Sequence, residues 1–232
     1  MTGDSRRAEL QRNLEHLRGR IGAAAADSGR AAGEITLIAV TKTFPASDVR
    51  LLADLGLRDF GENRDQEARP KAAAAPECHW HFLGRLQRNK ARSVSSYAGT
   101  VHSVDRPELI AALDRGAVAN DRTIEVFLQL SLDSATHRGG ASPTEILDLA
   151  AQVQSAERLQ LVGLMAVPPL DVDPDQAYSE CAAIRSELIQ RYPQAGAFSA
   201  GMSADLESAI RHGATHVRVG TALLGGRPRL LR

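Results

Sequence analysis

Short apolar segments alternate with longer polar, alanine-rich segments along most of the chain from residue 35 onward. Runs of about four to eight β-branched or apolar residues are typical of buried strands, and the longer stretches rich in Ala, Leu, Glu and Arg are typical of helices. Strands are predicted over residues 35–40, 57–60, 79–83, 100–104, 123–130, 159–164, 196–199 and 215–219. Eight strands with helices between them predict an α/β fold, a closed (β/α)8 TIM-type barrel.

The residues before the first strand follow a helical pattern instead. One apolar stripe at helical spacing is formed by Leu10, Leu14, Leu17 and Ile21. This stripe predicts an extra N-terminal helix that docks on the barrel. No composition break divides the chain, so we expect one domain over residues 1–232, with residues 1–30 as the helix and its connection.

An open doubly wound sheet would give a similar pattern of strands and helices. Against it, no Gly-x-Gly-x-x-Gly motif follows the first strand and no Walker loop is present. The closed barrel is therefore the preferred interpretation.

Several polar residues precede the predicted helices and are expected to be N-caps: Ser47, Asp105, Ser142 and Ser203. Glu145 stands three residues after Ser142, which is the spacing of a capping box. Residues 167–174 contain three prolines and predict a loop.

Composition narrows the classes of function. Lys plus Arg and Asp plus Glu both number 28, so the net charge is zero and a nucleic-acid partner is not indicated. Only 4% of residues are aromatic, so the core must consist largely of Ala, Val, Leu and Ile. Cys78 and Cys181 are far apart, which argues against a disulfide framework. The N-terminus has no apolar signal-peptide core and no segment is long enough to cross a membrane, so we expect a cytoplasmic protein.

The carboxyl ends of the strands are where a (β/α)8 barrel places its functional residues. Lys42 directly follows the first apolar run. An amine must be neutral to attack an aldehyde, and a low-dielectric barrel mouth favours the neutral form. A solvated lysine at the barrel rim is the alternative interpretation.

Two glycine-containing loops follow the predicted seventh and eighth strands. Residues 199–203 include Gly201 and Ser203, and the second loop begins at Gly220 and Thr221. Backbone amides in such loops can approach a phosphate closely, at the pair of strands where barrels often bind one. The alternative for Ser203 is a plain N-cap.

Arg218 lies two residues before Gly220, and alternation along the strand points it to the same face as His216. An inward arginine needs an acceptor, which is either a ligand or a buried carboxylate. His79 and His81 also share a strand face, but no third residue at convincing spacing completes a metal site. The basic run 87–92 is interpreted as solvated surface.

Six ordered blocks carry a resemblance to a known family: LIAVTKTFPAS around Lys42, FGENRDQEA at 60–68, WHFLGRLQRNK at 80–90, GLMAVPP at 163–169, GMSADLESAI at 201–210 and VRVGTALLG at 217–225. In these blocks the chain closely resembles the pyridoxal 5'-phosphate (PLP) homeostasis protein family. The resemblance implies a monomeric barrel similar to the N-terminal domain of alanine racemase, with PLP as its cofactor.

The same resemblance implies a role for individual residues. Lys42 would carry PLP as an aldimine, and Arg218 would face the pyridine nitrogen. An arginine there stays protonated and disfavours a pyridinium, which makes PLP a poorer electron sink. The remaining contacts would be Asn63 and Met165 along the cofactor and Ser203, Gly220 and Thr221 at its phosphate. Family members often carry a lysine in the loop after the fifth strand, where this chain has Arg138, which cannot attach PLP covalently.

Three functions are compatible with a lysine and a phosphate site in a barrel. The preferred one is a non-catalytic PLP carrier that buffers the cofactor or delivers it to apoenzymes in transient contact. A PLP-dependent amino-acid racemase is the alternative. It would need an acid or base opposite Lys42, and we expect no added domain to supply one because only residues 221–232 follow Gly220. A Schiff-base aldolase is a third possibility, although its lysine usually lies on a later strand.

Overall fold

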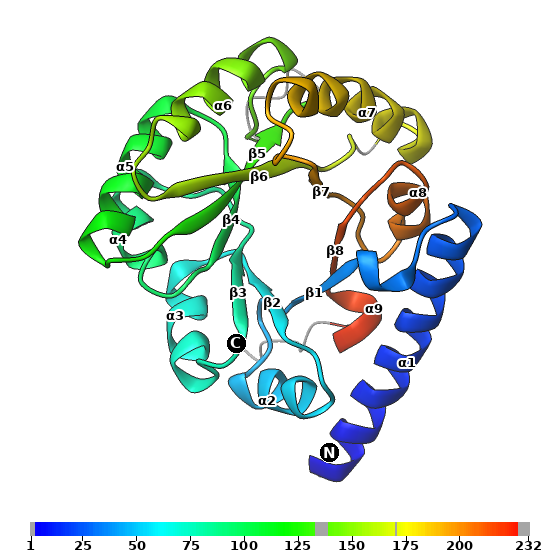
Figure 1. Ribbon diagram of the computed structural model, residues 1–232. Helices are drawn as coiled ribbons and strands as arrows, with labels where there is room; N and C mark the ends of the chain where they lie inside the picture. The colour runs from blue at the N-terminus through cyan, green and yellow to red at the C-terminus, as the bar shows by residue number, and fades with distance from the viewer. Residues whose placement is uncertain (1–2, 133–138, 170, 227–232) are drawn as a thin grey trace.

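Eight parallel strands form a closed barrel in the computed structural model, which describes residues 3–132, 139–169 and 171–226. Helices surround the barrel on the outside (Figure 1). Each strand pairs with the next in the sequence, and the last closes on the first, from Thr36 opposite His216 to Ala39 opposite Val219. The strands are β1 (Thr36–Val40), β2 (Asp59–Glu62), β3 (His79–Phe82), β4 (Thr100–Val104), β5 (Ile124–Leu130), β6 (Leu159–Ala166), β7 (Ala197–Ser199) and β8 (His216–Val219). The (β/α)8 barrel is confirmed.

One strand is displaced from its predicted position. β2 begins at Asp59, whereas residues 57–60 were expected to form it. Leu57 belongs to the preceding turn, because its amide donates to the carbonyl of Leu52 and Gly56 adopts a φ of +86°. The apolar character of Leu57 reflects burial at a helix end. Strand β6 also continues two residues further than expected, to Ala166.

The helices that cover the barrel are α1 (Gly3–Asp27), α2 (Ala46–Asp54), α3 (Asp65–Ala74), α4 (Ala91–Val94), α5 (Pro107–Ala119), α6 (Ile146–Gln154), α7 (Pro174–Arg191), α8 (Leu206–Arg211) and α9 (Thr221–Leu224). Short 3₁₀ turns occur at η1 (Ala32–Glu34), η2 (Arg88–Lys90) and η3 (Pro143–Glu145). The predicted loop 167–174 is confirmed as far as Asp173, with residue 170 outside the described residues, but Pro174 is already the first residue of α7.

The expected N-caps are confirmed at one position only. Ser142 precedes η3, and its amide and hydroxyl both donate to Glu145, over 2.8 and 2.6 Å. Ser47 lies inside the first turn of α2, which begins after Pro45. The expectation for Ser47 was therefore wrong.

Asp105 and Ser203 were also expected to be N-caps, and both expectations were wrong. Arg106 is the cap of α5, and the carboxylate of Asp105 instead accepts from the Arg106 side chain and, over 3.2 Å, from the amide of Gly140. Asp205 is the cap residue of α8, and the Ser203 hydroxyl accepts from the amide of Ala222 over 3.2 Å. In both cases a tertiary partner competes successfully with the local amides.

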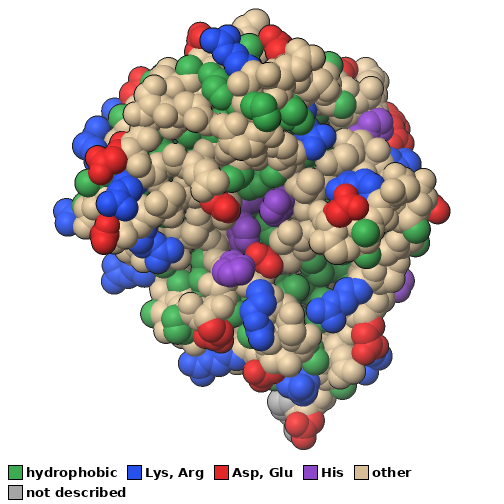
Figure 2. Space-filling view, viewed as in Figure 1, with side chains coloured by type: hydrophobic (Ala, Val, Ile, Leu, Met, Phe, Trp, Pro, Cys, Tyr) green, Lys and Arg blue, Asp and Glu red, His purple; other side chains and the backbone are tan. Residues whose placement is uncertain are grey.

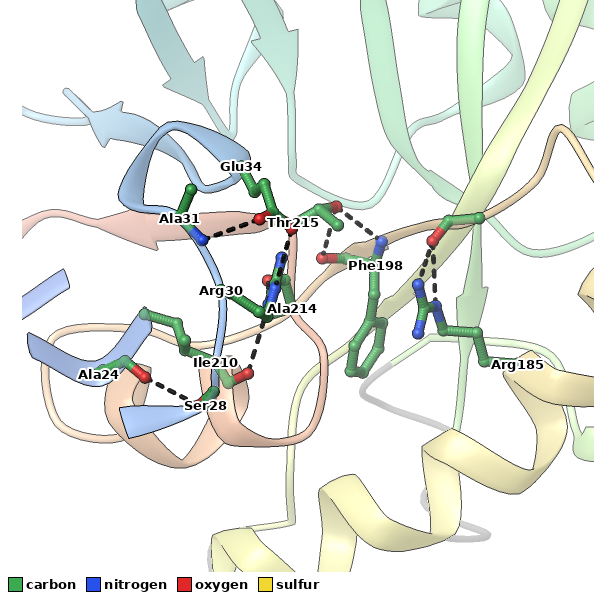
Figure 3. Close-up of polar contacts among 11 residues, drawn as sticks. Ala24, Ser28, Arg30, Ala31, Glu34, Arg185, Phe198, Ile210, Ala214 and Thr215 are labelled. Atoms are coloured by element: carbon green, nitrogen blue, oxygen red, sulfur yellow. Dashed lines mark hydrogen bonds and ion pairs between the residues drawn. The ribbon is translucent and has the colours of Figure 1, made fainter. Parts of the chain in front are cut away.

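Helix α1 packs along α8 and α9, as Figure 1 shows. Its predicted apolar stripe is buried: Leu10, Leu14, Leu17 and Ile21 are each at most 5% exposed. Beyond the helix, Arg30 donates to the carbonyls of Ile210 and Ala214, over 3.4 and 2.7 Å (Figure 3). The stripe lies on the helix that packs along α8 and α9, and the Arg30 bonds attach the connection after α1 to the loop that precedes β8.

Aliphatic side chains and alanines fill most of the space between strands and helices, as the composition predicted. The barrel interior differs, because it contains buried polar side chains from four strands: His81, His102, Ser199 and Arg218. Figure 2 shows His side chains gathered at the centre of the face viewed along the barrel. Both cysteines are free and buried. Across the described residues, no helix combines the length and apolar character that a membrane crossing requires.

Candidate functional site

A cavity of about 330 Å³ lies at the carboxyl ends of the barrel strands. All seven residues singled out from the sequence line it: Lys42, Asn63, Met165, Ser203, Arg218, Gly220 and Thr221. Apolar neighbours complete the wall, among them Val40, Phe44 and Leu83. The seven predicted residues come from the ends of five strands, β1, β2, β6, β7 and β8, and meet in one place although they are up to 179 positions apart, from Lys42 to Thr221.

Lys42 is held between two anchored threonines. Thr41 is fully buried, and its hydroxyl donates to Glu62 over 2.7 Å. Thr43 adopts a φ of +70°, which is unusual for a β-branched residue, and its amide donates to Glu67 over 2.9 Å. The backbone on both sides of Lys42 is therefore fixed by carboxylates from β2 and α3.

A buried ion pair supports this turn from below. Lys71 Nζ lies 2.5 Å from Glu62 Oε1 and also donates to the carbonyl of Thr41 over 2.8 Å. Burial raises the pKa of Glu62, and the bonds from Lys71 and Thr41 oppose that rise. The second carboxylate oxygen of Glu62 has no hydrogen-bond partner among the described residues. Sequence reasoning did not identify this pair, because Lys71 lies in a helix with no distinguishing motif.

Asn63 is positioned by a close approach of two backbones. A Cβ atom on Gly84 would lie 2.2 Å from the carbonyl oxygen of Asn63, so only glycine fits there. On the opposite side, Met165 is 3% exposed and pairs with Ser199 between β6 and β7. The amide side chain and the thioether thus reach the cavity from rigid backbone.

The predicted phosphate loops lie next to each other. The Ser203 hydroxyl joins them by accepting from the amide of Ala222, the second residue of α9. Gly220 packs tightly, since a Cβ there would come within 3.3 Å of the carbonyl of Val40. Arg20 of α1 donates to the carbonyl of Ser203 over 3.1 Å and forms an ion pair with Glu207.

Two residues that the sequence did not single out brace the loop after β7. The Tyr178 hydroxyl donates to Asp205 over 2.7 Å and accepts from the amide of Gly201 over 3.0 Å. The other oxygen of Asp205 accepts from the amide of Met202 over 2.7 Å. Tyr178 lies in α7 and is fully buried, so the loop is held from behind by the helix layer.

Arg218 is 6% exposed and reaches the cavity from β8. Its Nη1 donates to the Ser199 hydroxyl over 2.6 Å and its Nη2 to the carbonyl of Ala166 over 2.9 Å. The buried carboxylate that was left open as an alternative acceptor does not occur here, because both described acceptors of Arg218 are neutral. Burial lowers the pKa of Arg218. His216 shares its face as predicted, with its ring against Phe127.

The cavity contains few ionisable groups. Among the described residues that line it, Lys42 and Arg218 are the charged side chains, and none is Asp, Glu, His, Cys or Tyr. The described lining therefore provides no second acid or base opposite Lys42. That arrangement suits binding of an anionic aldehyde better than proton transfer at a substrate carbon.

Other candidates from the sequence lie away from this cavity. The basic run 87–92 lies mostly on the surface and borders a neighbouring cavity of about 580 Å³, which shares Asn63. Arg138 lies outside the described residues. His79 and His81 both approach Asp59, and no cluster of three or more potential metal ligands occurs in the described part of the chain.

Comparison with known proteins agrees with this architecture. The alanine racemase N-terminal domain family matches residues 7–228, so the chain belongs to that class of barrel domain. A pyridoxal phosphate homeostasis protein of Mycobacterium tuberculosis is 47% identical, over 98% of this chain and 95% of the relative. One from Escherichia coli is 37% identical, over 94% and 97%. The chain belongs to the pyridoxal phosphate homeostasis protein family.

A solved relative adds structural support. The structure of PipY from Synechococcus elongatus with PLP bound superposes with a TM-score of 0.80 at 34% identity. The match covers 93% of this chain and 100% of PipY.

Proposed function

We propose that this protein binds PLP through Lys42 and functions in PLP homeostasis, holding the cofactor for buffering or delivery without catalytic turnover. One observation carries the proposal: a single cavity of about 330 Å³ brings together a lysine, an arginine, and two adjoining loops with Ser203 and Gly220. PLP has an aldehyde, a ring nitrogen and a phosphate. The lysine would bind the aldehyde, the arginine would face the ring nitrogen, and the two loops would hold the phosphate. The bound group would supply a reactive aldehyde that the protein keeps from other amines.

The residues fit PLP at each of its ends. Lys42 enters from β1, and the Ser203 and Thr221 loops follow β7 and β8. Arg218 is fixed by Ser199 and Ala166, and it cannot accept a hydrogen bond from a protonated pyridine. Met165, Asn63 and Gly220 complete the wall, and a side chain at Gly220 would press on the carbonyl of Val40.

The small number of lysines favours Lys42 as the residue that attaches PLP. The sequence has three lysines, Lys42, Lys71 and Lys90. Lys71 is buried and engaged by Glu62 and Thr41, and Lys90 lies 3.8 Å from Asp65 at the neighbouring cavity. Lys42 is the lysine that lines the cavity with Arg218.

The test uses the purified protein with PLP, borohydride reduction and intact-mass analysis, for wild type, Lys42→Ala and the matched control Lys90→Ala. We expect a yellow protein and one reduced adduct in wild type and in Lys90→Ala, and neither in Lys42→Ala. An adduct in Lys42→Ala, or none in wild type, would sink the assignment.

Catalysis is tested separately from binding. A racemase needs a second acid or base, and the described lining of the cavity supplies none. We therefore expect the PLP-loaded protein to leave L-alanine unchanged in a chiral assay. Production of D-alanine above the rate of free PLP, abolished in Lys42→Ala, would favour the racemase instead.

The proposal includes a cellular setting. We propose that residues 1–232 form one PLP-binding domain, with residues 1–30 as its N-terminal helix and connection, and that it acts as a cytoplasmic monomer. PLP would pass to apoenzymes in transient contact. Mixing the loaded protein with an apoenzyme, with and without a dialysis membrane between them, separates contact-driven transfer from free release.

A further inference from the structure

Five polar side chains from five strands form a continuous series of hydrogen bonds through the barrel interior. Arg218 Nη1 lies 2.6 Å from Ser199 Oγ, which lies 2.9 Å from His102 Nδ1. His102 Nε2 lies 2.9 Å from His81 Nδ1, and His81 Nε2 lies 3.2 Å from Asp59 Oδ1. We call these contacts the hydrogen-bond series.

The series joins the two ends of the barrel. Arg218 lines the cavity that contains Lys42, whereas Asp59 is the first residue of β2, and its side chain is 25% exposed. Between them, His102 and Ser199 have no exposed surface and His81 is 6% exposed. Water therefore has little access to the central bonds, and the donors and acceptors must satisfy one another.

The chemistry of arginine sets the direction of every bond. A guanidinium has donors only, so the Ser199 oxygen accepts from Arg218. The nitrogen of His102 is then the acceptor for the Ser199 hydroxyl hydrogen, because a buried hydroxyl without an acceptor is costly. Burial also lowers the pKa of His102 well below its usual value, so the ring is neutral.

The same reasoning continues along the series. A neutral His102 that accepts at Nδ1 carries its hydrogen on Nε2 and donates it to His81 Nδ1. His81 must then carry its hydrogen on Nε2, where it donates to Asp59. Burial raises the pKa of Asp59, but its contacts with His81 and His79 outweigh burial and lower that pKa overall, so Asp59 accepts as a carboxylate.

We propose that Ser199, His102 and His81 are positioning residues for Arg218, and that this one-way series holds the guanidinium in place for the PLP ring. The inference rests on the proposed function for its consequence, although the tautomers do not depend on PLP. A cation at one end and a carboxylate at the other polarise each intervening bond in the same sense. The hydrogen-bond series thus links Arg218, at the proposed PLP site, to Asp59 at the opposite end of the barrel.

Two other histidines, His79 and His216, lie near the His81 and His102 rings or their partner Asp59, and they can affect measurements on those rings. His79 Nδ1 lies 3.4 Å from Asp59 Oδ1. The ring of His216, from β8, lies 6.5 Å from that of His81 and 6.4 Å from that of His102. Burial lowers the pKa of His216 to about 4, so it adds no charge to the interior near neutral pH.

The first experiment needs no cofactor. Long-range ¹H–¹⁵N correlation spectra of the histidine-labelled apoprotein at pH 7.5 report which ring nitrogen carries hydrogen, with assignment by His81→Asn and His102→Asn. We expect neutral rings with hydrogen on Nε2 for both residues. A hydrogen on Nδ1 of either ring overturns the proposed direction, whether or not the protein binds PLP.

The second experiment links the series to the cofactor. Ser199→Ala removes the acceptor of Arg218, and Ser95→Ala is the matched control, since Ser95 is also fully buried but bonds Arg92 and Asn120. We expect PLP affinity to fall about tenfold or more in Ser199→Ala, as for a lost bond to a charged donor, and the His102 and His81 nitrogen shifts to change. Ser95→Ala should match wild type in both.

A conservative substitution at Asp59, the solvent-accessible end of the series, tests the same role with less risk of misfolding than Ser199→Ala. Asp59→Asn keeps the shape of the last acceptor but removes its charge, so we expect altered nitrogen shifts of His81 and His102 and a PLP affinity lower by about two- to fivefold. If Ser199→Ala and Asp59→Asn both bind PLP as wild type does, the positioning role is wrong. Failure of wild type itself to bind PLP would instead overturn the proposed function and leave the tautomer result standing.

Discussion

The hydroxyl of Thr41 donates to the buried carboxylate of Glu62 over 2.7 Å, and Lys71 Nζ bonds both this carboxylate and the Thr41 carbonyl. Thr41 directly precedes Lys42, so the position of the Lys42 side chain depends on the ion pair that holds Thr41. Such a pair need not add net stability, but removing one partner leaves an uncompensated buried charge.

We therefore expect Lys71→Met to lower the free energy of unfolding by ~3–5 kcal/mol. The double variant Glu62→Gln/Lys71→Met should recover a large part of that loss, because a neutral amide can still accept from Thr41. Urea denaturation measures both. Lys90→Met is the control, because the Lys90 side chain is 39% exposed and its nitrogen lies 3.8 Å from Asp65, and it should cost about 1 kcal/mol or less. Equal losses in the single and double variants would contradict the argument.

Arg20 connects the N-terminal helix to the predicted phosphate loop, through the carbonyl of Ser203 and the carboxylate of Glu207. Arg20→Ala should loosen this loop and weaken PLP binding about fivefold, equivalent to ~1 kcal/mol. Arg12 is exposed on the same helix, so Arg12→Ala provides a charge-matched control. Fluorescence titration with PLP gives both affinities. Similar values for the two variants would mean that α1 does not organise the site.

Gly84 determines where Asn63 can lie, because its missing Cβ would stand 2.2 Å from the Asn63 carbonyl oxygen. Gly84→Ala must displace that backbone, so we expect a loss of ~1–3 kcal/mol in stability and a clear loss of PLP affinity. Gly99→Ala is the comparison, since a Cβ there meets nothing within 4 Å. Thermal unfolding and PLP titration of both variants test this, and unchanged binding in Gly84→Ala would argue against a role for Asn63.

The barrel was predicted from local patterns, and Lys42, Ser203 and Gly220 from a rule about strand ends, whereas Asn63 and Met165 were implied by the family resemblance. The N-caps predicted at Asp105 and Ser203 were wrong, because tertiary partners compete there with the local amides. Nothing in the sequence indicated that His81 and His102 would meet, since their contact arises only when β3 and β4 pair and the barrel closes. The partners of Lys71 and Tyr178 were missed for the same reason.

His216 makes stability depend on pH. Burial lowers its pKa from 6.5 to about 4, so between these values the unfolded chain binds a proton that the folded protein does not. The sign follows directly: stability is full above pH 6.5 and falls as the pH decreases toward 4, by about 2 kcal/mol from pH 7 to pH 5 for this group. His102, whose pKa burial also lowers, acts in the same direction.

His216→Gln removes one titrating group from the interior while keeping a polar side chain beside Thr215. We expect its free energy of unfolding to change less between pH 7 and pH 5 than that of wild type, by about the 2 kcal/mol assigned to the imidazole. Urea unfolding curves at both pH values measure the difference. Because the comparison is between slopes, a uniform loss of stability in the variant does not disturb it. Parallel pH profiles for the two proteins would show that His216 is solvated or paired in a way that lets it take up a proton in the folded state.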